Sequence, residues 1–229
     1  MLSNPVRSVV GGLRAHISAT DWDNLRASGV RRVFHPGDQL LRQGEGGDHV
    51  YVLLTGAVKV IRSEAAGGRT VLTVRSAGDV IGDIAAIDGG RRSASVSALT
   101  ALDSRLLHGA EFRRFLERME VSAGFTRYAF SRLRESDSQR TELAVLPVLE
   151  RVARALARLH DAAAMESGRA AIDLPQQDLA ELVGASRNAV VLALGVLRAE
   201  RLIDTRRRCI ILMDVARLRH RANGGNRDE

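Results

Sequence analysis

The feature that most restricts the fold of this chain is a series of short, β-rich runs separated by glycine. From about Val33 to Leu107, runs of aliphatic residues and threonine are interrupted by glycine at intervals of roughly ten residues. The clearest runs are 50–54, 58–61, 70–74 and 80–82. Many short strands at this spacing are typical of an all-β sandwich or barrel, and we predict a jelly-roll.

A second β signal is the alternation between Arg92 and Leu99. Small apolar residues fall on one side of an extended chain and serines on the other: Ala94, Val96 and Ala98 against Ser93, Ser95 and Ser97. Because successive side chains of a strand point to opposite faces, we expect the apolar residues to face the core.

After Leu107 the hydrophobic period changes to that of a helix. A first helix is indicated by Phe112, Phe115, Leu116 and Met119, and a longer one is predicted from Val121 to Leu146. The longer helix carries a heptad-like stripe: Phe125, Ala129, Leu133, Ser136, Arg140 and Leu143. Such a stripe packs either on the chain's own barrel or on a twin helix; its length and polar interruptions favour a dimer seam.

Pro147 ends the long helix, because proline cannot continue a helix but suits the first turn of a new one. The next helix is predicted from Val148 to Leu159, before a polar loop at 165–169. Further on, an apolar-patterned helix opens at Pro175, Gly184 makes a tight turn, and Ser186 caps a second helix. This order predicts a helix-turn-helix, followed by a winged turn at 204–208 and a strand from Cys209 to Met213.

Composition narrows the class of protein. The 229 residues carry a formal net charge of +7 with a pI near 10.9, and nearly all of the positive charge is arginine. Arginine binds phosphate and guanine edges, which favours a nucleic-acid partner; a GC-rich genome would produce the same bias. No segment has the pattern of a signal peptide, and no apolar run approaches the roughly 18 residues that span a bilayer. We therefore expect a cytoplasmic protein without a membrane partner.

Candidate metal ligands and catalytic residues are sparse. The single cysteine, Cys209, excludes an intrachain disulfide and a cysteine-ligated iron–sulfur cluster within one subunit. The six histidines lack ligand spacing, and the sequence contains no zinc-protease pair, nucleophile elbow or phosphate-binding loop followed by lysine. We expect no enzymatic activity, no metal and no covalently bound cofactor.

The two halves of the chain resemble the two halves of Crp/Fnr transcription regulators. Residues 178–187, Asp-Leu-Ala-Glu-Leu-Val-Gly-Ala-Ser-Arg, resemble the family's helix-turn-helix signature. Gly-Asp-Val-Ile-Gly-Asp at 78–83, with Arg-Ser-Ala-Ser-Val at 92–96, resembles the phosphate-binding cassette of cyclic-nucleotide-binding domains. The resemblance covers about residues 20 to 215. It implies an α+β protein with a jelly-roll sensor domain at 1–120, a dimerisation helix at 121–146 and a winged helix-turn-helix DNA-binding domain at 147–229.

The resemblance also implies ligand-binding residues. In this family an arginine and a serine hold a cyclic phosphate, and an acidic residue binds the ribose 2′-hydroxyl; Arg92, Ser93 and Asp83 match, with Gly82 beside Asp83. Asp83 is one methylene shorter than the usual glutamate. In the alternative, Arg92 pairs with Asp83 in a barrel that binds no ligand.

Two residues of the long helix match the family positions that meet the base of the ligand, Ser136 and Asp137. An ionised Asp137 can only accept hydrogen bonds, which favours guanine, with its adjacent N1–H and 2-amino donors, over adenine. In the alternative, Asp137 pairs with Arg140 or Arg134 on the helix surface.

On the DNA side, Ser186 matches a family phosphate contact and Arg187 the arginine that reads guanine. Asn188 replaces a glutamate that reads cytosine, and Leu192 replaces a second base-reading arginine, so the target should differ from the usual family palindrome. Asparagine can bind an adenine edge, or it is simply a solvated cap residue. Further phosphate contacts are expected from Gln176, Gln177, Arg206, Arg207 and Arg208.

The predicted function is that of a sequence-specific DNA-binding transcription regulator. It would act as a homodimer on an inverted repeat, with cyclic AMP, cyclic GMP or a cyclic dinucleotide as its allosteric effector. The expected partners are double-stranded DNA, a second copy of the chain and, from the family resemblance, RNA polymerase. The alternative is a ligand-independent, constitutive or architectural DNA-binding protein with a vestigial sensor barrel.

Overall fold

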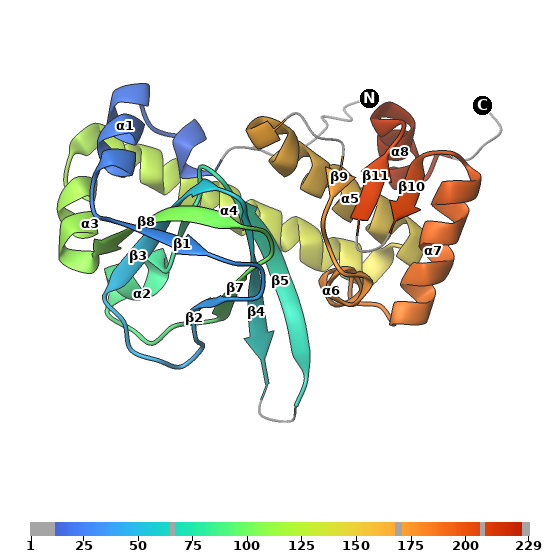
Figure 1. Cartoon of the computed structure of the whole chain (residues 1–229), viewed down its shortest axis with the longest axis horizontal. Coiled ribbons are helices and arrows are strands. Elements are labelled where there is room, and N and C mark those ends of the chain that lie inside the picture. The colour runs from blue at the N-terminus through green and yellow to red at the C-terminus, as the bar shows by residue number, and fades with distance from the viewer. Residues whose placement is uncertain (1–11, 65–66, 168–170, 207–208, 226–229) are drawn as a thin grey trace.

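The computed structural model describes residues 12–64, 67–167, 171–206 and 209–225. A β-sandwich with covering helices forms one lobe and a smaller, mainly helical domain forms the other (Figure 1). The long helix α4 (Met119–Val145) and helix α5 (Val148–Ser167) connect them.

The sandwich consists of two four-stranded antiparallel sheets, as the jelly-roll prediction requires. Their strand orders are β1-β8-β3-β6 and β2-β7-β4-β5. The strands are β1 (Val30–Phe34), β2 (Gln39–Leu41), β3 (His49–Thr55), β4 (Ala57–Ser63), β5 (Arg69–Ser76), β6 (Val80–Ile81), β7 (Ser95–Ala98) and β8 (Leu102–His108). The predicted alternation is confirmed, because Ala94, Val96 and Ala98 are buried and the serines between them are not.

Helices cover one sheet of the sandwich. They are η1 (Leu13–Ala15), α1 (Ala19–Ala27), α2 (Asp83–Asp88) and α3 (Gly109–Leu116), followed by α4. The apolar residues between these helices and the sheet form a cluster that includes Trp22, Val52, Phe112 and Tyr128. Met119, which we assigned to the same helix as Phe112, instead begins α4 and is 85% exposed.

The boundary at Pro147 follows from local sterics. The residue before a proline is disfavoured in the helical region, and Leu146 is extended with φ −98° and ψ 142°. Helix α5 begins directly after Pro147 but continues to Ser167, eight residues beyond the predicted end at Leu159. The loop predicted at 165–169 is therefore partly helical.

The C-terminal domain contains the predicted helix-turn-helix and wing. Helices α6 (Gln176–Leu182) and α7 (Arg187–Ala199) meet at 102°, and strands β10 (Ile203–Arg206) and β11 (Cys209–Leu212) form an antiparallel hairpin. Strand β9 (Ala171–Ile172), which pairs with β11, and helix α8 (Val215–Ala222) were not predicted. Gly184 takes the turn with φ 58°, and a Cβ there would lie 2.8 Å from Leu143 Cδ2. This left-handed φ favours glycine, which also leaves room for the Leu143 side chain.

Among the described residues, no single helix is both long and apolar enough to cross a membrane, although α6 and α7 together, as a bent pair, pass the same test of length and composition. Many of the apolar residues of this pair form the core of the C-terminal domain, including Leu179, Val190 and Leu197.

The two lobes are joined by an ion pair. Lys59 Nζ, on β4, lies 2.8 Å and 2.7 Å from the two carboxylate oxygens of Asp178 on α6. The Lys59 side chain is 16% exposed and that of Asp178 6%. Arg69 on β5 adds longer contacts, 3.5 Å to Asp178 and 3.3 Å to Glu181. The β4–β5 hairpin thus holds the first helix of the helix-turn-helix, as their proximity in Figure 1 also shows.

Lys59→Met should lower the free energy of unfolding by about 2–3 kcal/mol, because it leaves the carboxylate of Asp178 buried with only a partly exposed arginine beside it. Urea denaturation measures this change. The control is Arg62→Met on the same strand, whose pair with Glu64 is exposed and should contribute about 0.5 kcal/mol or less. Equal effects of the two substitutions would contradict the importance of the interdomain pair.

Candidate functional site

The segment from Gly82 to Ser93, which contains helix α2, includes a buried arginine. Arg92 is 4% exposed; its Nη1 donates to the Gly82 carbonyl and its Nη2 to the His49 carbonyl, both at 2.8 Å. Added Cβ atoms would lie 2.7 Å from the guanidinium at Gly82 and 2.6 Å at Gly47. The two glycines therefore make the space that Arg92 fills.

Arg92 is a buried cation bound mainly by neutral groups. Burial and Arg92 both lower the pKa of His49, which favours a neutral ring, and His49 Nδ1 lies 3.3 Å from Arg92 Nη2. Burial also lowers the pKa of Arg92 itself. Among the described residues, no carboxylate forms an ion pair with Arg92. An anion beside it would compensate the cost of burying this charge.

Asp83 has a different partner from the one considered above. Its Oδ2 accepts a 2.9 Å hydrogen bond from Arg132 Nη1 on α4, so the alternative of an Arg92–Asp83 pair is wrong. Asp83 is 6% exposed and follows Gly82, whose φ is 82°. Ser93, the other cassette residue, is exposed.

Arg132 belongs to a polar network between α4 and the barrel. Its Nη1 lies 3.2 Å from Tyr128 Oη, its guanidinium carbon lies 5.3 Å from the Tyr128 ring centroid, and Tyr128 donates at 2.7 Å to Asp79. Burial raises the pKa of Asp79 and raises that of Tyr128 well above its ordinary value. Sequence reasoning missed this network. The available signal was the four-residue spacing of Gly124, Tyr128 and Arg132, which marks one helix face.

Ser136 and Asp137 lie on different faces of α4. Ser136 is half-buried and stands one turn beyond Arg132, on the side of the barrel. The side chain of Asp137 is 62% exposed and lies 3.8 Å from Arg140, one of the two surface partners considered above. Ser136 therefore shares the helix face of Arg132, which binds Asp83 of the cassette, and Asp137 does not.

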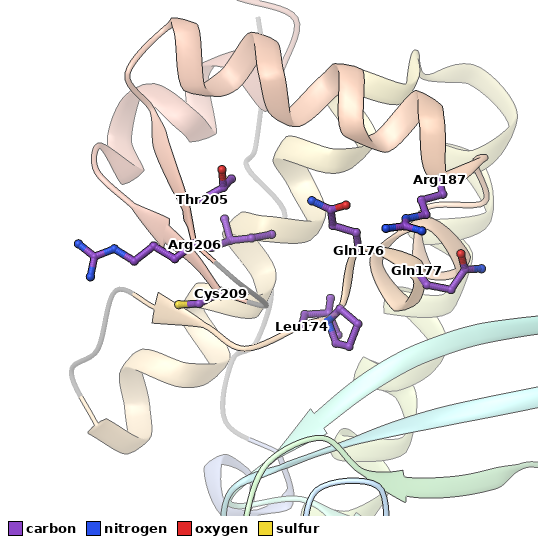
Figure 2. Close-up of a pocket in the computed structure, with 9 residues that line it drawn as sticks. Leu174, Gln176, Gln177, Arg187, Thr205, Arg206 and Cys209 are labelled. Atoms are coloured by element: carbon purple, nitrogen blue, oxygen red, sulfur yellow. The ribbon is translucent and has the colours of Figure 1, made fainter.

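A hollow of about 450 Å³ lies between the helix-turn-helix and the wing. Figure 2 shows Gln176, Gln177 and Arg187 on one side of it, with Arg206 and Cys209 on the other. Four of the predicted DNA-binding residues thus line one cavity, although they come from two helices and the wing.

The remaining predicted DNA-binding residues lie beside this hollow or outside the described residues. Ser186 caps α7 by accepting from the Ala189 amide at 3.2 Å, which leaves its hydroxyl proton available to a phosphate. Asn188 is exposed on the first turn of α7. The side chain of Arg206 is 74% exposed. Arg207 and Arg208 lie outside the described residues. No group of three candidate metal ligands occurs among the residues that the structure describes.

Comparison with known proteins supports both halves. The sequence-family model of the cyclic nucleotide-binding domain matches residues 31–119, and the family model of the Crp-like helix-turn-helix domain matches residues 150–221. A CRP-like cAMP-activated global transcriptional regulator of Mycobacterium tuberculosis is 30% identical over 193 residues, 82% of this chain and 86% of its own. The chain belongs to the Crp/Fnr family. Because it contains the Crp-like helix-turn-helix domain, it is a DNA-binding transcription regulator. Its relatives are transcription regulators and not enzymes.

Other relatives agree with this assignment. The cAMP-activated global transcriptional regulator CRP of Escherichia coli O157:H7 is 29% identical over 182 residues, 76% of this chain and 84% of its own. The structure of FixK2 from Bradyrhizobium japonicum superposes with a TM-score of 0.73 at 19% identity, covering 84% of this chain and 96% of that one. The c-di-GMP responsive regulator CLP of Xanthomonas campestris gives 0.65 at 22%, covering 85% and 99%. These two structural likenesses show the fold.

Asp79→Asn should change how stability depends on pH. The pKa of Asp79 is raised in the folded chain, so its contribution is fully present below the unfolded value of 3.8 and is lost as the pH rises through the folded value. Arg75, Arg132 and Glu135 are the charged neighbours, and asparagine can still accept from Tyr128. The stability of the variant relative to wild type should increase between about pH 4 and pH 7, by about 1.4 kcal/mol for each unit of pKa elevation.

Urea denaturation across that pH range measures the difference, with Asp88→Asn, an exposed aspartate of α2, as the control. A difference that is constant with pH, or equal to that of the control, would show that the Asp79 carboxylate is not held in a charge-disfavouring site.

Proposed function

We propose that this Crp/Fnr regulator binds an inverted-repeat DNA site as a homodimer and is controlled by a cyclic nucleotide in its sensor domain. The observation that carries the proposal is the exposed N-terminal turn of α7, with Arg187 and Asn188, beside a hollow that the wing closes through Arg206. A major groove admits such a helix, and arginines at its flank suit phosphates. The parts are a sensor at 1–120, a dimerisation helix at 121–146 and a DNA-binding domain at 147–229.

The exposed stripe of α4 supports a homodimer. Phe130 and Leu133 are each 55% exposed, and Ala129, Arg140 and Ala144 continue the same face. Phe125, one turn before Ala129, does not extend this exposed stripe, because its ring packs inward on Phe112 and Tyr128 at centroid distances of 6.0 and 5.8 Å. A second α4 is the natural partner for a long stripe of this kind.

The DNA site should consist of two half-sites about 34 Å apart, one helical turn, since each chain has one recognition helix. Arg187→Ala should weaken binding by about 1–3 kcal/mol and relax the preference at one base pair of each half-site. Selection of bound DNA from a random pool, followed by titration at several salt concentrations, measures both effects. The proposal fails if the full chain binds only as a monomer or shows no preference for inverted repeats.

Arg206→Gln is the matched variant in the same cavity. As a phosphate contact it should weaken binding to all sequences alike and lower the salt slope by about one. A changed preferred sequence for this variant, or a uniform loss for Arg187→Ala, would exchange the two assigned roles.

Arg92 is buried and forms no ion pair with a carboxylate among the described residues, which supports an anionic effector. A cyclic phosphate would bring the charge that Arg92 lacks, and Ser93 stands beside it. Two of the relatives described above are named as cAMP-activated and one as c-di-GMP responsive, so both ligand classes are candidates. The exposed Asp137 would meet the ligand of the partner subunit, where it would favour guanine over adenine. By family resemblance, we also propose that the protein contacts RNA polymerase and is located in the cytoplasm.

Cyclic GMP or cyclic di-GMP should bind the full chain more tightly than cyclic AMP, and Asp137→Ser should remove this preference. Calorimetry gives the affinities. A bound ligand also stabilises the folded chain, by about 2.7 kcal/mol at a free concentration of a hundred times its dissociation constant. The melting temperature therefore rises when the ligand is added. Tighter binding of cyclic AMP, or an unchanged ratio in Asp137→Ser, would contradict the guanine preference. If no cyclic nucleotide binds while DNA binding is intact, the chain is the ligand-independent regulator with a vestigial barrel.

A further inference from the structure

The outward face of α7 carries large aliphatic side chains. Val191, Leu192 and Val196 are 45%, 72% and 41% exposed. The inward face of the same helix is buried in the domain core through Val190, Ala193, Leu194 and Leu197. The fold of the domain therefore does not use the three outward residues. Adjacent exposed aliphatic residues on a helix mark a contact surface.

This apolar surface is continuous with the DNA-reading positions. Residues three and four apart share a helix face, so Val191 stands one turn beyond Arg187 and Leu192 one turn beyond Asn188. Helix α7 contains no acidic residue, and its last turn carries Arg198. A helix with this charge can approach DNA phosphates without repulsion. Continuity and charge together favour DNA as the occupant of the surface.

Gly195 points to a close approach at the same face. It lies one turn beyond Val191, and a Cβ added there would meet nothing within 4 Å. Packing inside the chain therefore does not require glycine at this position. Glycine also lowers the stability of a helix relative to alanine, so its presence here needs another reason. The missing side chain leaves space outside the helix, where the wall of a DNA groove would lie.

We propose that Leu192 contacts the C5-methyl group of a thymine in each half-site, with Val191 beside it. Thymine methyl is the apolar group that the major groove presents, so it is the base feature that an aliphatic side chain can recognise. Asn188 and Leu192 then read neighbouring positions, one by hydrogen bonds and one by apolar contact. This inference rests on the proposed function, because it needs α7 to lie in the major groove.

Uracil in place of thymine tests the contact, because uracil lacks only the methyl group. The full chain is titrated with its selected DNA site, with and without cyclic nucleotides, and each thymine of the half-site is replaced in turn. One replacement should weaken binding about fourfold per half-site, the effect of losing one buried methyl group. Replacements elsewhere should have no effect.

Two variants identify the side chain. Leu192→Ala should bind the thymine site more weakly and lose the difference between thymine and uracil at that position. Leu72→Ala, which removes an exposed leucine from β5 of the sensor, should keep both the affinity and the difference. Gly195→Ala should bind DNA more weakly while melting at the same or a higher temperature, and unchanged DNA affinity would overturn the close approach.

The outcomes separate this inference from the proposed function. If the chain selects an inverted repeat but tolerates uracil at every thymine, the methyl contact is wrong and the regulator assignment stands. A uracil effect that persists in Leu192→Ala also overturns the role of Leu192. If the chain selects no DNA sequence, the proposed function and this inference fail together.

Discussion

The arrangement of the molecule depends on the buried hydrogen bond from Tyr128 to Asp79. Tyr128 is 1% exposed, and its hydroxyl lies 2.7 Å from the carboxylate. A buried polar pair of this kind can be satisfied in one rotation of the helix, since any other would leave both groups unpaired. That rotation turns Arg132 toward the cassette at Asp83 and Leu133 toward solvent. One contact thus orients both the ligand side and the exposed stripe of α4.

The same helix also carries the DNA-binding domain. Near its end, Glu142 is 7% exposed and accepts from Arg158 Nη1 at 2.9 and 2.8 Å, which fixes α5 against α4 across the break at Pro147. The second attachment is the Lys59–Asp178 pair at the β4–β5 hairpin. The helix-turn-helix is therefore held at two points. A ligand that moved α4 relative to the barrel would change both attachments. Such a difference between two arrangements is what a ligand needs in order to shift the population from one to the other.

Features that are determined by residues close together in the sequence could be predicted, and features that depend on residues far apart in the sequence could not. The strands, Pro147 and the helix-turn-helix were predictable because glycine, proline and a capping serine act within a few residues. The stripe on α4 was only partly correct, because Phe125 packs inward while Leu133 faces outward. The partner of Asp83 could not be predicted, since Arg132 lies 49 positions away and becomes a neighbour only after the helix has taken its rotation.

The Arg132–Asp83 pair bears on whether the barrel still serves as a sensor. A carboxylate has two oxygens with about four lone-pair sites. Arg132 engages Oδ2, so the remaining acceptor capacity is compatible with a sugar hydroxyl. The shorter reach of Asp83 compared with glutamate brings the cation of α4 close to the cassette, where it adds to the positive potential around Arg92. Asp83 balances the charge of Arg132, whereas Arg92 has no carboxylate partner among the described residues, so an anion at the cassette would offset the cost of burying the Arg92 guanidinium. This unbalanced buried charge is the physical reason for proposing an anionic effector at the cassette.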